Sequence, residues 1–167
     1  MAQRGGITSS ITLRDFQPAD GDAVVGLLRQ LQAHEYPMNS RLKPPHDIGP
    51  AYLEVLRNNC RASEGSILIA EQDGRIAGCA VLYCALEEPG HEELVAHHYA
   101  LVSELIVDDR HRHTGVGQAL LRACEARARA AGRDEIALAV LAGNHSARDF
   151  YTRAGFTPQR IRLGKSL

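Results

Sequence analysis

The sequence predicts a mixed α/β (α+β) domain that is built on one sheet and has about four helices. Three observations lead to this fold class. Segments with apolar residues at helical spacing alternate with apolar runs of strand length. Gln72-Asp73-Gly74 lies between two apolar runs, which is typical of a hairpin. The chain has 167 residues, 44% hydrophobic and 23% charged, a size and composition expected of one globular domain.

The amino-terminal part predicts a strand and a first helix. We expect residues 1–9 to be a flexible lead and residues 10–167 to form the single domain. The first strand is predicted at 10–14. Asp20 or Asp22 is suited to cap the helix that follows. The apolar stripe of this helix, which Pro37 ends, consists of Val24, Leu27, Leu28 and Leu31.

A second helix and a hairpin come next. The helix is predicted from about Ile48 to Asn59, after a proline-rich loop, with Tyr52 on its apolar face. The two hairpin strands are predicted at 66–71 and 75–86.

The carboxy-terminal half predicts a regular alternation of strands and helices. A strand is expected at 100–107 and a long helix at about 115–131, which Gly132 ends. The apolar run 135–141 is suited to a buried parallel strand. A short helix is predicted at 144–154, and the tail 156–163 has the pattern of a last strand.

Charge and cysteine content exclude several classes of protein. Nineteen basic residues nearly balance twenty acidic ones, so net charge favours neither nucleic acid nor a membrane surface as a partner. The only lysines, Lys43 and Lys165, do not complete a P-loop. The four cysteines form no CxxC pair, which favours reduced, partly buried thiols in a cytoplasmic protein over disulfides or a metal site.

The segment Arg112-His113-Thr114-Gly115-Val116-Gly117 lies between a predicted strand and a predicted helix. The first N–H groups of a helix have no partner within it, and the helix dipole adds positive potential there. The turn is therefore suited to a phosphate or pyrophosphate group. A simple helix-capping turn is the alternative, and the spacing does not fit the dinucleotide-binding G-x-G-x-x-G motif.

A second motif narrows the interpretation. Arg112-x-x-Gly115-x-Gly117 is followed, after a strand, by Asn144-x-x-Ala147-x-x-Phe150-Tyr151-x-x-x-Gly155-Phe156. With both motifs the chain resembles the GCN5-related N-acetyltransferase (GNAT) family, which transfers an acetyl group from acetyl-CoA to an amine. The resemblance covers about 100–156 and implies that family's fold, a mixed and mostly antiparallel central sheet.

The resemblance also implies how acetyl-CoA would be held. The backbone N–H groups from His113 to Gln118 (His113, Thr114, Gly115, Val116, Gly117 and Gln118) would hold the pyrophosphate, and Arg112 would also bind the cofactor. The strand end Leu105, Ile106 and Val107 would pair with the pantetheine arm, because a bulge in the family separates this strand from its neighbour. Asn144 would bind the cofactor from the opposite side, which is compatible with its being a helix N-cap.

Two residues are candidates for the chemistry. The resemblance implies that Tyr151 lies near the thioester sulfur and protonates the leaving thiolate, although its helical spacing also fits a core position. Glu104 is the candidate base. Strand parity places it on one face with Val102 and Ile106, where apolar neighbours would raise its pKa. Binding of the substrate ammonium group, or pairing with an arginine, is the alternative role of Glu104.

The acceptor is expected to be a primary amine, with a small molecule favoured over a protein amine. We expect its pocket between the first two helices, their loop and residues 87–96. Acidic residues that would attract a cation there are Glu35, Glu87, Glu88, Glu92 and Glu93, with Tyr36 and Tyr52 as candidate lining residues. No metal is expected, since the histidines lack a helical metal-binding spacing. A homodimer follows only from the resemblance, and a non-catalytic acyl-CoA sensor is the alternative function.

Overall fold

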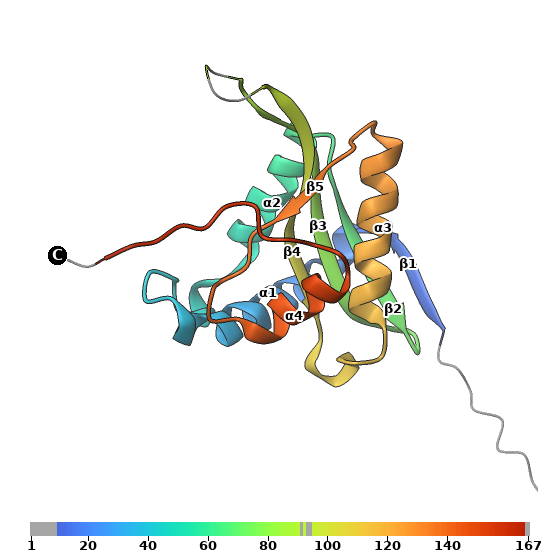
Figure 1. Cartoon of the computed structure of the whole chain (residues 1–167). Helices are drawn as coiled ribbons and strands as arrows, with labels where there is room; N and C mark the ends of the chain where they lie inside the picture. The colour runs from blue at the N-terminus through green and yellow to red at the C-terminus, as the bar shows by residue number, and fades with distance from the viewer. Residues whose placement is uncertain (1–9, 91, 93–94, 166–167) are drawn as a thin grey trace, which may run out of the picture.

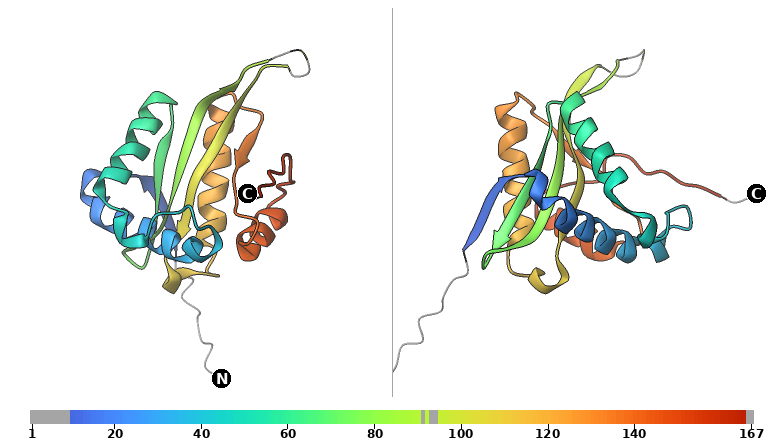
Figure 2. Two further views of the ribbon diagram at one scale, coloured as in Figure 1. Left: turned by 90° about the vertical axis from the view of Figure 1, so that its left-hand side faces the viewer. Right: turned by 180° about the vertical axis from the view of Figure 1, so that it is seen from behind.

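The computed structural model describes residues 10–90, 92 and 95–165, so the expected flexible lead at 1–9 lies outside the described residues. A five-stranded sheet lies between two layers of helices in this part of the chain (Figures 1 and 2). The main elements are, in chain order, β1 (Ile11–Asp15), α1 (Gly21–Glu35), α2 (Pro50–Ala62), β2 (Ser66–Gln72), β3 (Arg75–Glu88), β4 (His97–Val107), α3 (Val116–Ala130), β5 (Ile136–Leu138) and α4 (His145–Arg153).

The strands lie in the sheet in the order of the sequence. The pairs β1–β2, β2–β3 and β3–β4 are antiparallel, whereas β4 and β5 are parallel. The sheet is therefore mixed and mostly antiparallel, as predicted. The predicted hairpin is also confirmed: Gln72 pairs with Arg75, and both Asp73 and Gly74 have positive φ, at 54° and 71°.

Two hydrophobic cores lie on opposite faces of the sheet. The stripe of α1 and the buried side of α2 cover one face, where they pack on residues such as Ile69, Val81 and Ile106. Helix α3 covers the other face and packs on residues such as Leu82 and Val102. Helix α4 lies beside α1 in Figure 1, and its aromatic residues pack at the margin of the α3 core.

A register shift interrupts the pairing of β3 with β4. Val81 pairs with Glu104 and Leu82 pairs with Val102, so Ser103 is an extra residue in β4. The bulge turns Glu104 to the α1 and α2 face together with Ile106, whereas Val102 lies in the core under α3. The prediction that Val102 and Glu104 share a face was therefore wrong, because parity fails where a bulge adds a residue.

The carboxy-terminal elements differ from the prediction in two respects. The strand expected at 135–141 is parallel to β4, but it covers only Ile136–Leu138 and is half-buried, because it has a neighbouring strand on one side only. The predicted strand at 156–163 was wrong, since residues 157–165 form neither strand nor helix.

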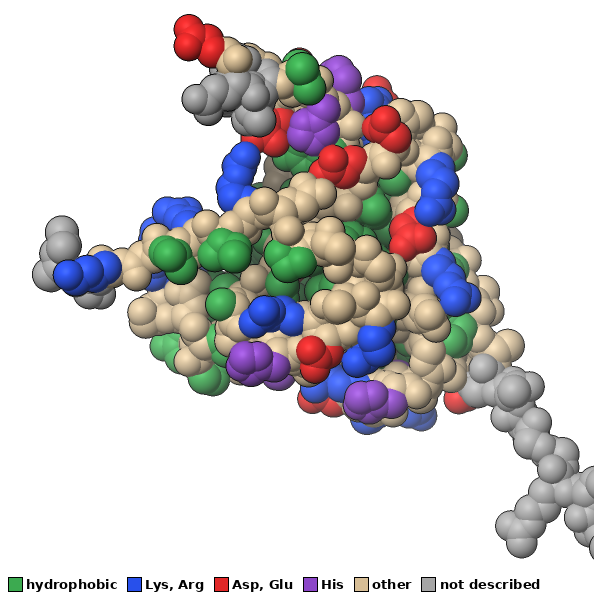
Figure 3. Space-filling model, in the orientation of Figure 1, with side chains coloured by type: hydrophobic (Ala, Val, Ile, Leu, Met, Phe, Trp, Pro, Cys, Tyr) green, Lys and Arg blue, Asp and Glu red, His purple; other side chains and the backbone are tan. Residues whose placement is uncertain are grey.

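The tail leaves the domain surface, as Figures 1 and 3 show. Ile161 and Leu163 are 79% and 90% exposed. The alternating apolar residues that predicted a strand therefore do not pack against the sheet. Arg160 instead forms an ion pair of 3.0 Å with Glu88 at the end of β3.

Candidate active site

Among the described residues, one edge of β4 has no strand partner in the carboxy-terminal part of the strand. On one side β4 pairs with β3 as far as Val107 opposite Gly78. On the other side the pairing with β5 ends at Val102 opposite Leu138. In the described part of the chain, the peptide groups of Leu105 to Val107 that face away from β3 therefore have no strand partner, and they offer donors and acceptors to an extended, amide-bearing ligand.

The turn after β4 leads into the amino terminus of α3. His113 and Gly115 have positive φ values of 63° and 94°, and Gly115 is the N-cap residue. The helical pattern begins with the bond from the Ala119 N–H to the Gly115 carbonyl, at 3.0 Å. The N–H groups of Val116 to Gln118 therefore have no acceptor within the helix, and the turn residues before them are exposed. This geometry is suited to an anion.

Basic side chains surround this turn, along the lower edge of the face in Figure 3. Arg112 is 44% exposed and forms an ion pair of 2.5 Å with Asp109. Arg110 forms bonds of 2.9 and 3.0 Å with Asp108, whose carboxylate is buried. Those bonds hold the pKa of Asp108 well below its usual range, against the effect of burial. Both guanidinium groups are thus partly neutralised by acidic neighbours.

Glu104 lies in the middle of β4 and accepts a hydrogen bond of 2.7 Å from the Tyr52 hydroxyl of α2. Burial raises the pKa of Glu104, the bond from Tyr52 opposes this shift, and the nearby negative charge of Glu35 adds to it. Burial also raises the pKa of Tyr52, as does the charge of Glu104. A half-buried carboxylate with a raised pKa has the properties of a general base.

Tyr151 of α4 belongs to the same group of residues. Burial raises its pKa to about 12, and the charges of Glu35 and Glu104 contribute to the shift. Its ring packs edge-on against Phe150 and Phe156, with centroids 5.2 and 5.8 Å apart. The aromatic contacts confirm that Tyr151 packs at the core margin, while its high pKa keeps the hydroxyl protonated, as a proton donor requires.

Asn144 connects α4 with α1. Its side-chain oxygen accepts a bond of 3.2 Å from the Ala147 N–H, which confirms the predicted N-cap. Its amide nitrogen donates to Glu35 at 3.3 Å. Glu35, the last residue of α1, is therefore held next to the start of α4.

The family model for the acetyltransferase (GNAT) family matches residues 27–156, which is most of the chain. This chain belongs to the GNAT family. A search of curated proteins found no match. The family assignment supports acetyl transfer as the general activity.

Solved structures with the same fold include several acetyltransferases. The BH1408 protein from Bacillus halodurans, solved as a point mutant, has a TM-score of 0.82 at 20% identity, over 93% of this chain and 99% of that one. The aminoglycoside N-acetyltransferase AAC(6')-Iy in complex with CoA has a TM-score of 0.70 at 18% identity, over 99% of each chain. A GCN5-related N-acetyltransferase from Ralstonia eutropha has a TM-score of 0.71 at 18% identity, over 95% of this chain and 99% of that one.

The GNAT fold brings some of the predicted site residues together and separates others. Glu35, Tyr52, Glu104 and Tyr151 influence one another electrostatically and form one group. Glu87 and Glu88 lie at the opposite end of the β3–β4 pairing from Glu104, and Tyr36 is 42% exposed at the end of α1. Glu93 lies outside the described residues.

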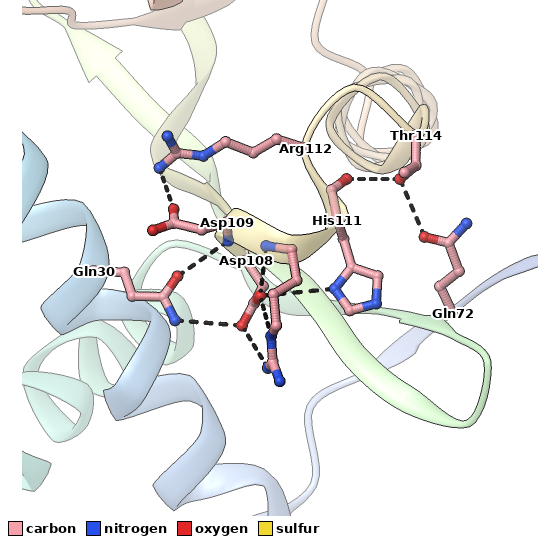
Figure 4. A network of polar contacts seen from close by, with 8 residues as sticks. Gln30, Gln72, Asp108, Asp109, His111, Arg112 and Thr114 are labelled. Carbon is pink, nitrogen blue, oxygen red and sulfur yellow. Dashed lines mark hydrogen bonds and ion pairs between the residues drawn. The ribbon is translucent and has the colours of Figure 1, made fainter.

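Three side chains of this region were not singled out from the sequence: Gln30, Gln72 and Asp108 form polar contacts around the turn before α3 (Figure 4). Their bonds join residues up to 79 positions apart, so no local pattern marks them.

The described residues show neither a cluster suited to a metal ion nor a helix suited to a membrane. No group of three or more His, Cys, Asp and Glu side chains among them is arranged to hold a metal ion. None of the helices in the described ranges has both the length and the apolar character needed to cross a membrane.

Proposed function

We propose that the protein transfers the acetyl group of acetyl-CoA to a primary amine of a small molecule, by direct attack in a ternary complex. One observation carries the proposal. The free edge of β4 extends from Glu104 toward the exposed amino terminus of α3. Tyr151 is close to Glu104, since the charge of Glu104 affects its pKa. This order matches the order of chemical groups in acetyl-CoA, from pyrophosphate through pantetheine to thioester.

Cofactor binding is assigned to backbone groups for the most part. The N–H groups from His113 to Gln118 would hold the pyrophosphate, and Leu105 to Val107 would pair with the pantetheine amides. Arg112 is placed to contact a phosphate oxygen when it leaves Asp109. Asn144 is assigned to the cofactor from the α4 side, a role that must coexist with its two bonds to Ala147 and Glu35.

The acetyl transfer requires that the ammonium nitrogen lose two protons and that the thiolate gain one. An alkyl ammonium group has a pKa of about 10 and is protonated at neutral pH, so Glu104 would remove a proton, directly or through water. The amine nitrogen then forms a bond to the acetyl carbon, and an N–H group of Leu105 to Val107 stabilises the oxyanion. As the carbon–sulfur bond breaks, Tyr151 gives its proton to the departing thiolate, and the acetylated nitrogen loses its second proton, which returns through water to the Tyr151 oxygen. The products are the acetylated amine and CoA, and the proton taken by Glu104 is released to solvent.

The cysteines support direct attack over an acetyl-cysteine intermediate. All four are free and buried. Burial raises the pKa of the Cys60 thiol to about 11 and those of Cys79 and Cys124 to about 12, and it also raises the pKa of Cys84. A thiol that stays protonated and buried is a poor nucleophile.

The other expectations about partners and place remain predictions. They are a homodimer, the absence of a metal and of nucleic-acid or membrane partners, and a cytoplasmic location. A homodimer is expected to appear as twice the monomer mass, about 36 kDa from 18.2 kDa, in light scattering.

The first experiment is thermal unfolding with acetyl-CoA, with CoA, ATP and NAD as comparisons. Acetyl-CoA and CoA should raise the unfolding midpoint, because a ligand of the folded state stabilises it by mass action, whereas ATP and NAD should not. Thiol release with a panel of amines, including an aminoglycoside such as neamine, then tests turnover. No shift at millimolar acetyl-CoA would refute the proposal. A shift without thiol release from any amine would favour the non-catalytic acyl-CoA sensor.

A further inference from the structure

The turn between β4 and α3 is attached to the rest of the domain at both ends (Figure 4). At its start, the Gln30 side chain of α1 donates to the Asp108 carboxylate and accepts from the Asp109 N–H, each at 3.3 Å. At its end, the Thr114 hydroxyl lies 3.1 Å from the side-chain oxygen of Gln72, the last residue of β2. Two glutamines from distant elements thus hold a turn of seven residues.

The turn needs such support because its backbone conformation is unfavourable by itself. His113 has a positive φ of 63°, a conformation that residues other than glycine rarely adopt. Strained positions persist only where the surroundings hold them. The single proton of the Thr114 hydroxyl is shared between the Gln72 oxygen, at 3.1 Å, and the His111 carbonyl, at 2.6 Å. The Thr114 hydroxyl therefore connects Gln72 with the strained part of the turn.

Gln72 is well suited to anchor the turn. It is 6% exposed and takes part in the β2–β3 hairpin, where it pairs with Arg75. Its position is therefore fixed by the sheet. Gln30 lies on α1 close to Leu27 and Leu28, which belong to the core, so its backbone is fixed as well. Each anchor belongs to a packed element and not to another loop.

We propose that Gln30 and Gln72 are positioning residues that hold the turn in its anion-binding shape before the cofactor arrives. Neither side chain needs to touch the ligand. Binding to a turn that is already ordered avoids part of the entropy loss of association, so the two glutamines increase affinity for the pyrophosphate part of CoA. The inference rests on the proposed function, since it assigns the turn to the CoA pyrophosphate.

The test compares Gln30→Leu and Gln72→Leu with the matched control Gln32→Leu. Gln32 is on the same helix as Gln30, but its amide donates to the Lys43 carbonyl at 2.6 Å, away from the turn. We expect the dissociation constant of CoA, measured by calorimetry, to rise about fivefold in Gln30→Leu and in Gln72→Leu. Gln30→Leu removes two bonds of 3.3 Å and Gln72→Leu removes one of 3.1 Å, and a net loss of about 1 kcal/mol corresponds to such a factor. Gln32→Leu should bind CoA like the wild type.

Turnover separates positioning from general loss of structure. The KM for acetyl-CoA should rise with the dissociation constant, whereas kcat at saturation should stay within about twofold, because the reacting groups are not altered. A double-mutant cycle with Thr114→Val should show that Gln72→Leu has little further effect once the hydroxyl is absent.

The outcomes distinguish this inference from the proposed function. If the wild type binds CoA and both leucine variants bind it equally well, the positioning role is refuted and the function stands. A fall in kcat equal to the rise in KM, together with a lower unfolding midpoint, would mean a merely structural role. If the wild type does not bind CoA, both the proposed function and the inference fail.

Discussion

The Tyr52 hydroxyl donates a hydrogen bond of 2.7 Å to the Glu104 carboxylate, and this bond joins α2 to the middle of β4. The bond favours the ionised carboxylate, whereas burial and the charge of Glu35 favour the protonated one. Tyr52 therefore limits how far the pKa of Glu104 rises. In the proposed mechanism the ionised form is the one that accepts a proton from the amine.

Replacement of Tyr52 by phenylalanine should move the acid limb of the pH–rate profile to higher pH. Without the hydroxyl, burial and Glu35 act unopposed, so Glu104 stays protonated to a higher pH and activity at neutral pH falls. Activity should recover in alkaline buffer. The measurement is kcat against pH, with Tyr99→Phe as the control at a tyrosine that stacks on His97. An acid limb that does not move would show that Tyr52 does not set this ionisation.

The Glu104→Gln variant tests the base directly. The amide is nearly the same size but cannot accept the proton, so kcat should fall by ~10²–10⁴-fold and the acid limb should disappear. CoA binding should not change. If Glu104 instead binds the substrate ammonium group, the KM of the amine will rise while the limb stays in place, and the assignment as base is then wrong.

Tyr151→Phe separates the acid role from the packing role. Phenylalanine keeps the edge-on contacts with Phe150 and Phe156 and removes only the hydroxyl. We expect kcat to fall by ~10²-fold or more with an unchanged unfolding midpoint and unchanged CoA affinity. Tyr99→Phe, at a tyrosine that stacks on His97, is the control. A Tyr151→Phe variant with normal kcat would leave Tyr151 as a core residue only.

Much of the fold could be predicted because it is encoded locally. The Asp73-Gly74 hairpin follows from two residues that tolerate positive φ. The long helix α3 follows from apolar spacing between Gly115 and Gly132, and the structure places it within one residue of both predicted ends. The proposal that its start binds phosphate rests on the general properties of a helix amino terminus.

The errors come from features that depend on pairing between distant segments. The bulge at Ser103 is set by how β4 aligns with β3, and no residue type in β4 marks it. The tail around Ile161 has the alternation of a strand, but a strand also needs a neighbour, which local sequence does not reveal. For the same reason the contact of Tyr52 with Glu104, 52 residues apart, became visible only in the structure.

Gly115→Ala should weaken CoA binding as well as stability. Gly115 has a φ of 94°, a backbone conformation that is strained for alanine. Space is not the obstacle, because an added Cβ would lie 3.7 Å from its nearest neighbour, a side-chain atom of Ile11. The backbone is therefore expected to shift and to misdirect the N–H groups at the start of α3. The control is Gly132→Ala, which has a φ of 73° at the other end of α3. Both variants should lose roughly 1–2 kcal/mol of stability, but only Gly115→Ala should raise the dissociation constant of CoA. Equal CoA affinity in the two variants would contradict the assignment of the turn.

Asp20→Asn should destabilise the fold at neutral pH and much less at acidic pH. The buried Asp20 carboxylate accepts bonds of 2.7 and 2.9 Å from Arg14 and one of 2.7 Å from the Gln17 N–H. The bond from Arg14 is the main cause that lowers the pKa of Asp20. A lowered pKa in the folded state stabilises the protein above the ordinary aspartate pKa of ~3.9, and this stabilisation is lost as the pH falls through the folded-state pKa.

Urea unfolding at pH 7 and pH 3 measures the effect of Asp20→Asn. We expect a loss of about 1–2 kcal/mol at pH 7, since Arg14 is partly exposed to solvent and its ion pair is partly screened. At pH 3 the wild type has lost part of the same stabilisation, so the difference should shrink. Asp22→Asn, at an exposed position two residues after Asp20 in the first turn of α1, should change stability much less than Asp20→Asn at pH 7. A deficit that stays constant between pH 7 and pH 3 would mean that Asp20 contributes through packing and not through its charge.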